Sequence, residues 1–109
     1  MIVLDTTDKS LPVVMSGAAA TTNPDFSADY EDERGSVLVS GNNNGTLNGT
    51  STVTLVAAPA DNARRRIQHV IIRNRDTAAV TVTVSLTDTA VARQQFSAAI
   101  ESGGTLEYS

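Results

Sequence analysis

Few residues in this sequence could act in catalysis or bind a metal ion, and the first to consider is its single histidine. His69 lies within the run Arg65–Asn74 and is flanked by aliphatic residues. A catalytic base needs a nucleophile and an orienting group nearby, and a metal site needs several His, Cys or carboxylate ligands. The sequence surrounds His69 with neither, and it has no glycine-rich phosphate loop or nucleophile-elbow serine. We interpret His69 as a partly buried strand residue and expect neither enzymatic activity nor a cofactor.

An acidic run, Asp29–Glu33, offers oxygens of the kind that calcium binds. The run lacks the glycine-punctuated alternation of an EF-hand loop. Runs of charge in proteins are usually solvated. We therefore expect no bound metal and interpret this segment as a solvated or interface-facing loop.

Three consecutive arginines, Arg64–Arg66, form the main basic feature. In a strand, successive side chains point to opposite faces, so only Arg64 and Arg66 would share one. The net charge of −4 disfavours nucleic-acid binding. Residues 1–54 carry seven acids and two bases (−5), whereas residues 55–109 carry five acids and six arginines (+1).

This uneven charge supports two hypotheses. In the first, the charged residues are simply solvated faces. In the second, the acidic segment of one subunit meets the arginines of another. The second hypothesis predicts an interface that contains Asp29, Glu31, Glu33, Arg64 and Arg66.

Length and composition indicate one small domain. A chain of 109 residues, 40% of them hydrophobic, can bury one modest core. Aromatic residues number only four (Phe26, Tyr30, Phe96 and Tyr108), which makes that core thin and favours a homo-oligomer, with a trimer as the best guess. Cysteine is absent, so no disulfide framework forms. The first residues lack a signal-peptide pattern and no run is long enough to cross a membrane, so we expect no membrane association.

Strict alternation gives the clearest strand. In Val80–Thr87 every even position is apolar and every odd one carries a hydroxyl. The run Arg65–Asn74 is also strand-like, and its apolar positions Ile67 and Val70 have opposite parity, which predicts a bulge near residues 68–69. Asn74–Thr77 is interpreted as the turn of a hairpin that joins these two strands.

Further strands follow at short intervals. The pattern predicts strands at Ser36–Ser40, Thr46–Ala58, Val91–Ile100 and Thr105–Tyr108, with a turn or flexible loop at Gly41–Gly45. No amphipathic helix stands out. The predicted fold class is all-β: a single antiparallel β-sandwich or jelly-roll-like barrel.

The first 35 residues follow a different pattern. Residues 2–4 and 11–15 are short apolar runs, residues 17–25 have no periodicity, and residues 26–34 are acidic. We expect residues 1–35 to form short strands plus an extended arm or long loop, attached to a sandwich body of residues 36–109. A long structureless stretch in a small domain usually has an external partner, so segment 17–35 is expected to lie against a neighbouring subunit.

The second half of the chain resembles a known class of proteins. The quoted segments are Val56–Ala60, Arg64–Ile67, Val70–Thr77 with Val80–Val84, and Gly103–Tyr108. Together they resemble small virion proteins of tailed bacteriophages, in which an Ala-Pro-Ala entry leads to a basic strand, an Asn-x-Asp-Thr hairpin and a closing Gly-x-Thr-Leu-x-Tyr strand. The resemblance covers about residues 56–109.

This resemblance implies a structural protein that is assembled in the host cytoplasm and located in the virion. The role it favours is a capsid decoration (cement) protein that binds the major capsid protein. A neck, tail or fibre component is the alternative within the class. A carbohydrate- or receptor-binding β-sandwich module is the alternative outside it, although such modules usually present exposed Trp or Tyr and this chain has no Trp.

Overall fold

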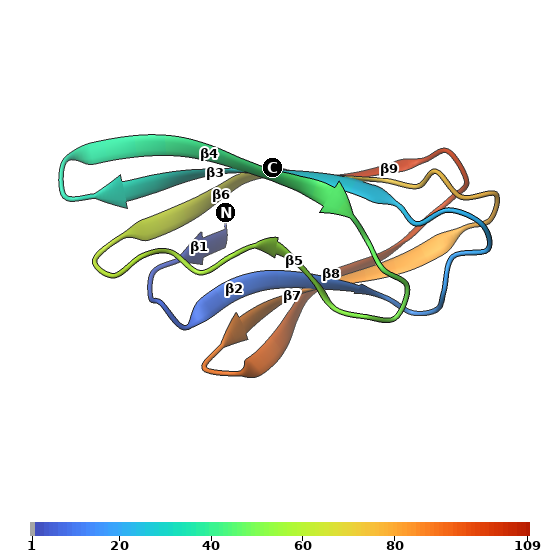
Figure 1. Ribbon diagram of the computed structural model, residues 1–109, viewed down its shortest axis with the longest axis horizontal. Coiled ribbons are helices and arrows are strands. Elements are labelled where there is room, and N and C mark those ends of the chain that lie inside the picture. The colour runs from blue at the N-terminus through green and yellow to red at the C-terminus, as the bar shows by residue number, and fades with distance from the viewer. Residues whose placement is uncertain (1) are drawn as a thin grey trace.

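Two antiparallel β-sheets stack face to face in the protein (Figure 1), which is described over residues 2–109 by a computed structural model. The strands are β1 (Ile2–Leu4), β2 (Lys9–Met15), β3 (Asp25–Arg34), β4 (Val37–Thr46), β5 (Val53–Val56), β6 (Arg64–Arg73), β7 (Val80–Asp88), β8 (Val91–Ile100) and β9 (Thr105–Tyr108). This arrangement confirms the all-β fold and the antiparallel β-sandwich.

The first sheet has the order β1–β6–β3–β4 and the second has the order β5–β2–β7–β8. In the first sheet β6 pairs along its whole length with β3. On its other side β6 pairs with β1 through residues 65–67 and with β9 through residues 70–73. The two halves of the sequence therefore interleave in both sheets, and neither half forms a separate unit.

The apolar core lies between the sheets and follows the predicted alternation. Val82 and Val84 of β7 are fully buried. In β6, Ile67 and Val70 are both buried because Gln68 is an extra residue: His69 pairs with Asp29, whereas Ile67 pairs with the next residue of β3. The bulge predicted near residues 68–69 is confirmed.

Phe96 lies at the margin of this core. Phe96 is only partly buried, and its ring stacks on Tyr108 of β9 with the centroids 5.6 Å apart. The two residues come from different sheets, so the stack closes the open side of the sandwich between β8 and β9.

The structure differs from the expected N-terminal arm. Residues 25–34 form β3, which lies between β6 and β4 inside the first sheet. Phe26 and Ala28 point into the core, while Asp29 and Glu31 lie on the outer face. Asp29, Glu31 and Glu33 thus share one face of an alternating strand, whereas Asp32 points to the other face. Removing this segment would take out a central strand.

Residues 16–24 link β2 to β3 and are held by one buried carboxylate. Asp76, only 3% exposed, accepts hydrogen bonds from the backbone N–H groups of Ala20, Thr21 and Thr22, and from the Thr21 hydroxyl. A fifth bond comes from the N–H of Thr77. These bonds lower the pKa of Asp76 well below its ordinary value, the backbone donor at Ala20 being the largest cause. The connection packs on its own domain.

The prediction that β6 and β7 form a hairpin is wrong, because these strands lie in different sheets. The connecting residue Asn74 is completely buried. Its Nδ2 atom donates to the carbonyl oxygens of Ala78, Ile100 and Glu101, and its Oδ1 atom accepts from the N–H of Asp76. The residues interpreted as a hairpin turn therefore carry the chain across from one sheet to the other.

The prediction of a turn or flexible loop at Gly41–Gly45 is also wrong, because this segment forms part of β4. A Cβ atom on Gly41 would lie 2.5 Å from the Tyr30 ring, and one on Gly45 would lie 3.1 Å from the Phe26 ring. Each glycine makes room for the aromatic ring of its partner on β3, so the two strands pair without interruption. The expected strand 46–58 is correspondingly reduced to β5.

The tight turn between β7 and β8 contains two residues in an unfavourable backbone conformation. Thr89 and Ala90 have φ angles of 50° and 65°, values that favour Asn and Gly. Ala90→Gly is expected to raise the free energy of unfolding by about 1 kcal/mol, because it relieves left-handed strain. Urea unfolding measures this change. Ala92→Gly, in the neighbouring strand, is the control and should lower stability; an equal loss at both sites would contradict the proposed strain.

Candidate assembly surface

The five residues that the charge pattern singled out share one face of the molecule. In the register of β3 with β6, Glu31 pairs with Arg66 and Glu33 pairs with Arg64. Directly paired residues of antiparallel strands point to the same face. Asp29 lies on this face as well, beside the partly buried His69. We call this surface, formed by Asp29, Glu31, Glu33, Arg64 and Arg66, the charged face.

Ion pairs on the charged face form within the chain. Arg66 places Nη2 2.7 Å from Glu33 Oε2 and Nη1 3.8 Å from Glu31 Oε1. Asp29 Oδ1 accepts a hydrogen bond of 2.6 Å from Asn42 Nδ2. The acids thus meet arginine and asparagine side chains of the same subunit. Arg66 therefore pairs with Glu31 and Glu33 without a second subunit.

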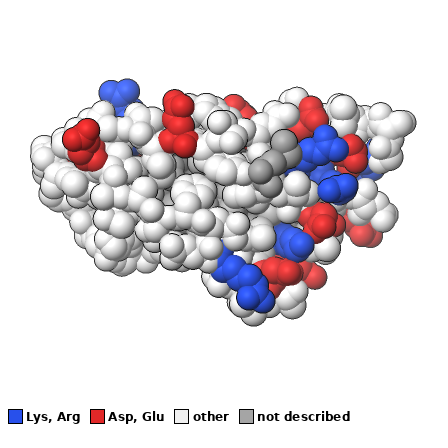
Figure 2. Space-filling view, turned by 180° about the vertical axis from the view of Figure 1, so that it is seen from behind, with Lys and Arg blue, Asp and Glu red and all other residues white. Residues whose placement is uncertain are grey.

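Charges gather at one end of the sandwich. Figure 2 shows most of the blue and red side chains of that view toward the end where the β3–β4 and β7–β8 hairpins turn, whereas the opposite half is mostly white. Surface ion pairs contribute little stability each. On this face the charged side chains therefore lie mainly at one end of the sandwich.

Below the charged face, Arg65 fixes the β3–β6 pairing from the inner side. Its Nε and Nη2 atoms donate to the two carboxylate oxygens of Asp32 at 2.7 and 2.9 Å, and its Nη1 atom donates to the Ala57 carbonyl oxygen at 2.9 Å. The guanidinium lies 4.1 Å from the centroid of the Tyr30 ring. The hydrogen bond to Asp32 raises the pKa of Arg65 against the opposing effect of burial. Tyr30 is thereby held over Gly41.

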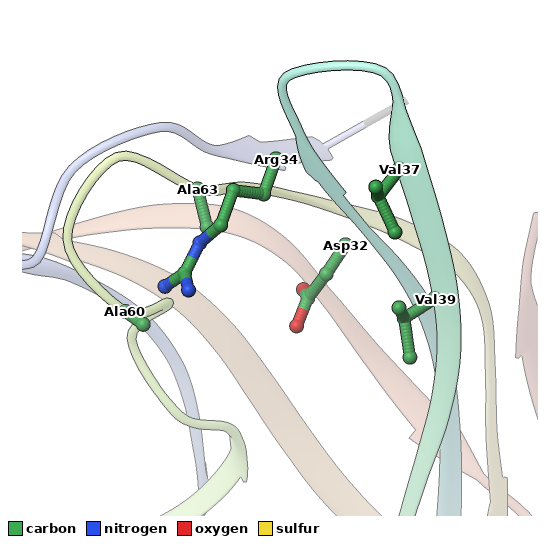
Figure 3. Close-up of a pocket in the computed structure, with 6 residues that line it drawn as sticks. All are labelled: Asp32, Arg34, Val37, Val39, Ala60 and Ala63. Carbon is green, nitrogen blue, oxygen red and sulfur yellow. The ribbon is translucent and has the colours of Figure 1, made fainter.

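A cleft of about 410 Å³ opens where the β3–β4 hairpin projects beyond the second sheet (Figure 3). Its lining comes from the hairpin and from the loop that enters β6: Asp32, Arg34, Val37, Val39, Ala60 and Ala63. The Arg34 Nη2 atom donates to the Asp61 carbonyl oxygen at 3.2 Å and ties the hairpin to this loop. The one carboxylate that lines the cleft, Asp32, is already bound by Arg65 and so is not free to act as an acid or a base there.

The free side of β4, which we call the β4 edge (Val37–Thr46), is the other prominent surface. β4 is the outer strand of its sheet and is ten residues long. Val37, Leu38 and Val39 are 59%, 56% and 58% exposed. Isolated apolar residues on a surface are ordinary, but three in succession on an unpaired edge are not.

Sequence reasoning missed this surface because it took Ser36–Ser40 as a strand entering a loop. The signal that could have revealed it is the alternation of Phe26, Ala28 and Tyr30 with polar residues, spaced like Gly45, Asn43 and Gly41 on the next strand. That match makes β3 and β4 one long hairpin. Its loop is Gly35–Ser36, with Gly35 at a φ angle of 61°.

Within residues 2–109 no group of three or more His, Cys, Asp or Glu side chains is placed to hold a metal ion. The same residues contain no helix long and apolar enough to cross a membrane. No family model, curated protein or solved structure matches the chain.

Proposed function

We propose that the chain is a non-enzymatic structural protein of a tailed-phage virion and acts as a capsid decoration (cement) protein. The observation that carries the proposal is the β4 edge, the outer side of a ten-residue strand that pairs with β3 alone and has three successive exposed apolar residues. A long, flat, hydrophobic edge is a template for pairing with another chain. Proteins that work alone normally protect such an edge.

Two further observations support an assembly role. The body is tied together by buried side-chain hydrogen bonds at Asn74 and Asp76, which suits a part whose surfaces must keep their shape. The resemblance of residues 56–109 to virion proteins supports a tailed-phage virion as the assembly that the protein joins. A neck, tail or fibre component would use the same edge, and the position of the protein on the particle separates these roles.

The test adds purified protein to virions that lack it. The protein is expected to occupy ordered sites in electron-microscopy maps and to raise the temperature at which the heads rupture. Leu38→Lys introduces a charge on the β4 edge and should lower the occupancy at least about tenfold. Val91→Lys, which replaces an apolar residue 50% exposed on the other sheet, is the matched control and should retain occupancy.

Full occupancy by Leu38→Lys would show that the β4 edge is not the assembly surface. Ordered density on a neck or tail in place of the shell would replace the decoration role with the alternative within the class. Failure of the wild-type protein to bind any part of the virion would overturn the proposed function.

A further inference from the structure

The free edges of the two sheets are not equally open to another strand. β1 and β9 are three and four residues long, and both lie beside β6. β5 is four residues long, and the Asn43 amide donates to its Leu55 carbonyl oxygen at 2.8 Å. β8 carries Arg93 and has an irregular register against β7 between Val84 and Ser85. Short length, capping, charge and bulges all hinder strand addition.

Before Asn43, whose side chain bonds β5, the β4 edge has none of these protections. It contains no charged residue and no proline. Its register with β3 runs from Val37 to Thr46 without a bulge. Among the strands of residues 2–109 it is the one long edge that offers a regular row of free backbone N–H and C=O groups.

We propose that residues 36–40, at the start of the β4 edge, pair antiparallel with the same residues of a second copy of this chain, about a two-fold axis at Leu38. This inference rests on the proposed function, because it takes the β4 edge as the assembly surface. Residues 36–40 read Ser-Val-Leu-Val-Ser, the same in both directions. Antiparallel pairing centred on Leu38 therefore places Leu38 opposite Leu38, Val37 opposite Val39 and Ser36 opposite Ser40 of the second copy.

The orientation of the side chains agrees with this register. Val37 and Val39 pair with Arg34 and Asp32 and so face the inner side, whereas Leu38 pairs with Glu33 and faces the outer side. Each apolar side chain then meets an apolar side chain of the second copy on its own face of the joined sheet.

Charge favours a second copy as the occupant. The edge is uncharged, so two copies bring no like charges directly opposite each other. An interface about a two-fold axis uses the same patch on both subunits, and a palindromic segment supplies that patch. The resulting unit is a dimer, in place of the trimer expected from the sequence.

Oligomeric state and cross-linking of the isolated chain test this inference. Wild-type protein should sediment at about twice the 11.4 kDa mass of the chain. Leu38→Lys places two lysines opposite each other on the axis and should raise the dimer dissociation constant at least about tenfold. The control Val91→Lys should leave it unchanged. Far-ultraviolet circular dichroism checks that both variants keep the fold.

Single cysteines test the register, because the natural chain has none. Under mild oxidation Leu38→Cys should form a disulfide-linked dimer, since the paired Cα atoms lie within disulfide range. Ser40→Cys, exposed on the same face, should not, because the two copies of residue 40 lie four residues apart along the strands. Cross-linking at residue 40 in preference to residue 38 would overturn the register.

A wild-type chain that stays monomeric throughout a concentration series would overturn self-pairing. If that monomer still occupies virions, the assembly function stands and the β4 edge binds a virion protein directly. A dimer that occupies no virion would instead overturn the proposed function and leave the self-pairing intact.

Discussion

Asp76→Asn is expected to lower the thermal midpoint by roughly 10 °C or more at neutral pH, a large shift for a domain of this size. The substitution keeps the shape of the side chain but removes its charge and turns one acceptor into a donor. Five donors point at the two carboxylate oxygens, four of them from residues 20–22. An amide in this position leaves some of these buried groups unpaired. Differential scanning calorimetry measures the shift.

The effect of Asp76→Asn should also depend on pH. Because folding lowers the pKa of Asp76, the carboxylate stabilises the protein fully above the unfolded-state pKa of about 4. That contribution is lost as the pH falls through the folded-state pKa. The difference in midpoint between wild type and variant should therefore be largest above about pH 5 and shrink in acid.

Asp25→Asn is the matched control. Asp25 is 42% exposed at its side chain and forms an ion pair with Arg75 at 2.9 Å, so its loss should change the midpoint little. A constant difference between wild type and Asp76→Asn from neutral pH down to acid would contradict the role assigned to the Asp76 carboxylate.

Asn74→Ala is expected to lower the free energy of unfolding by about 3 kcal/mol. The side chain is completely buried, and truncation leaves the carbonyl oxygens of Ala78, Ile100 and Glu101 without their amide donor. The N–H of Asp76 also loses its acceptor. Buried polar groups that lose a partner bear the full cost of desolvation. Urea unfolding measures the loss.

Asn44→Ala removes an amide of the same type from the exposed side of β4, where its Nδ2 atom donates only to Asn42. This control should change stability by less than about 0.5 kcal/mol. Equal losses for the two variants would mean that the buried hydrogen bonds of Asn74 do not hold the sheets together.

Most of the sandwich could be predicted from local patterns. The alternation in Val80–Thr87 identified β7, and the opposite parity of Ile67 and Val70 located the bulge in β6. Both features arise from side-chain periodicity within one strand, which a sequence displays directly.

Features that depend on a distant partner could not be predicted in this way. Gly41 suggested a turn, yet it lies in β4 because Tyr30 covers it from β3. Asn74 and Asp76 suggested a hairpin turn, yet the Asp76 side chain bonds residues 20–22 and the Asn74 side chain bonds residues 78, 100 and 101. These bonds direct the chain into the other sheet. The same dependence explains why the charged face was found but its internal ion pairs were not.

The interleaving of the two sheets has a consequence for biosynthesis. β1 pairs with residues 65–67, β2 pairs with β7, and β6 pairs with residues 105–108. The first sheet therefore needs residues up to Tyr108 and the second needs residues up to Ile100 before it is complete. Such non-local pairing makes folding slow, on the order of milliseconds to seconds. During that interval the hairpin of β3 and β4, which is local, can form first and expose its uncharged edge. High synthesis rates should therefore favour premature association of nascent chains through residues 36–40.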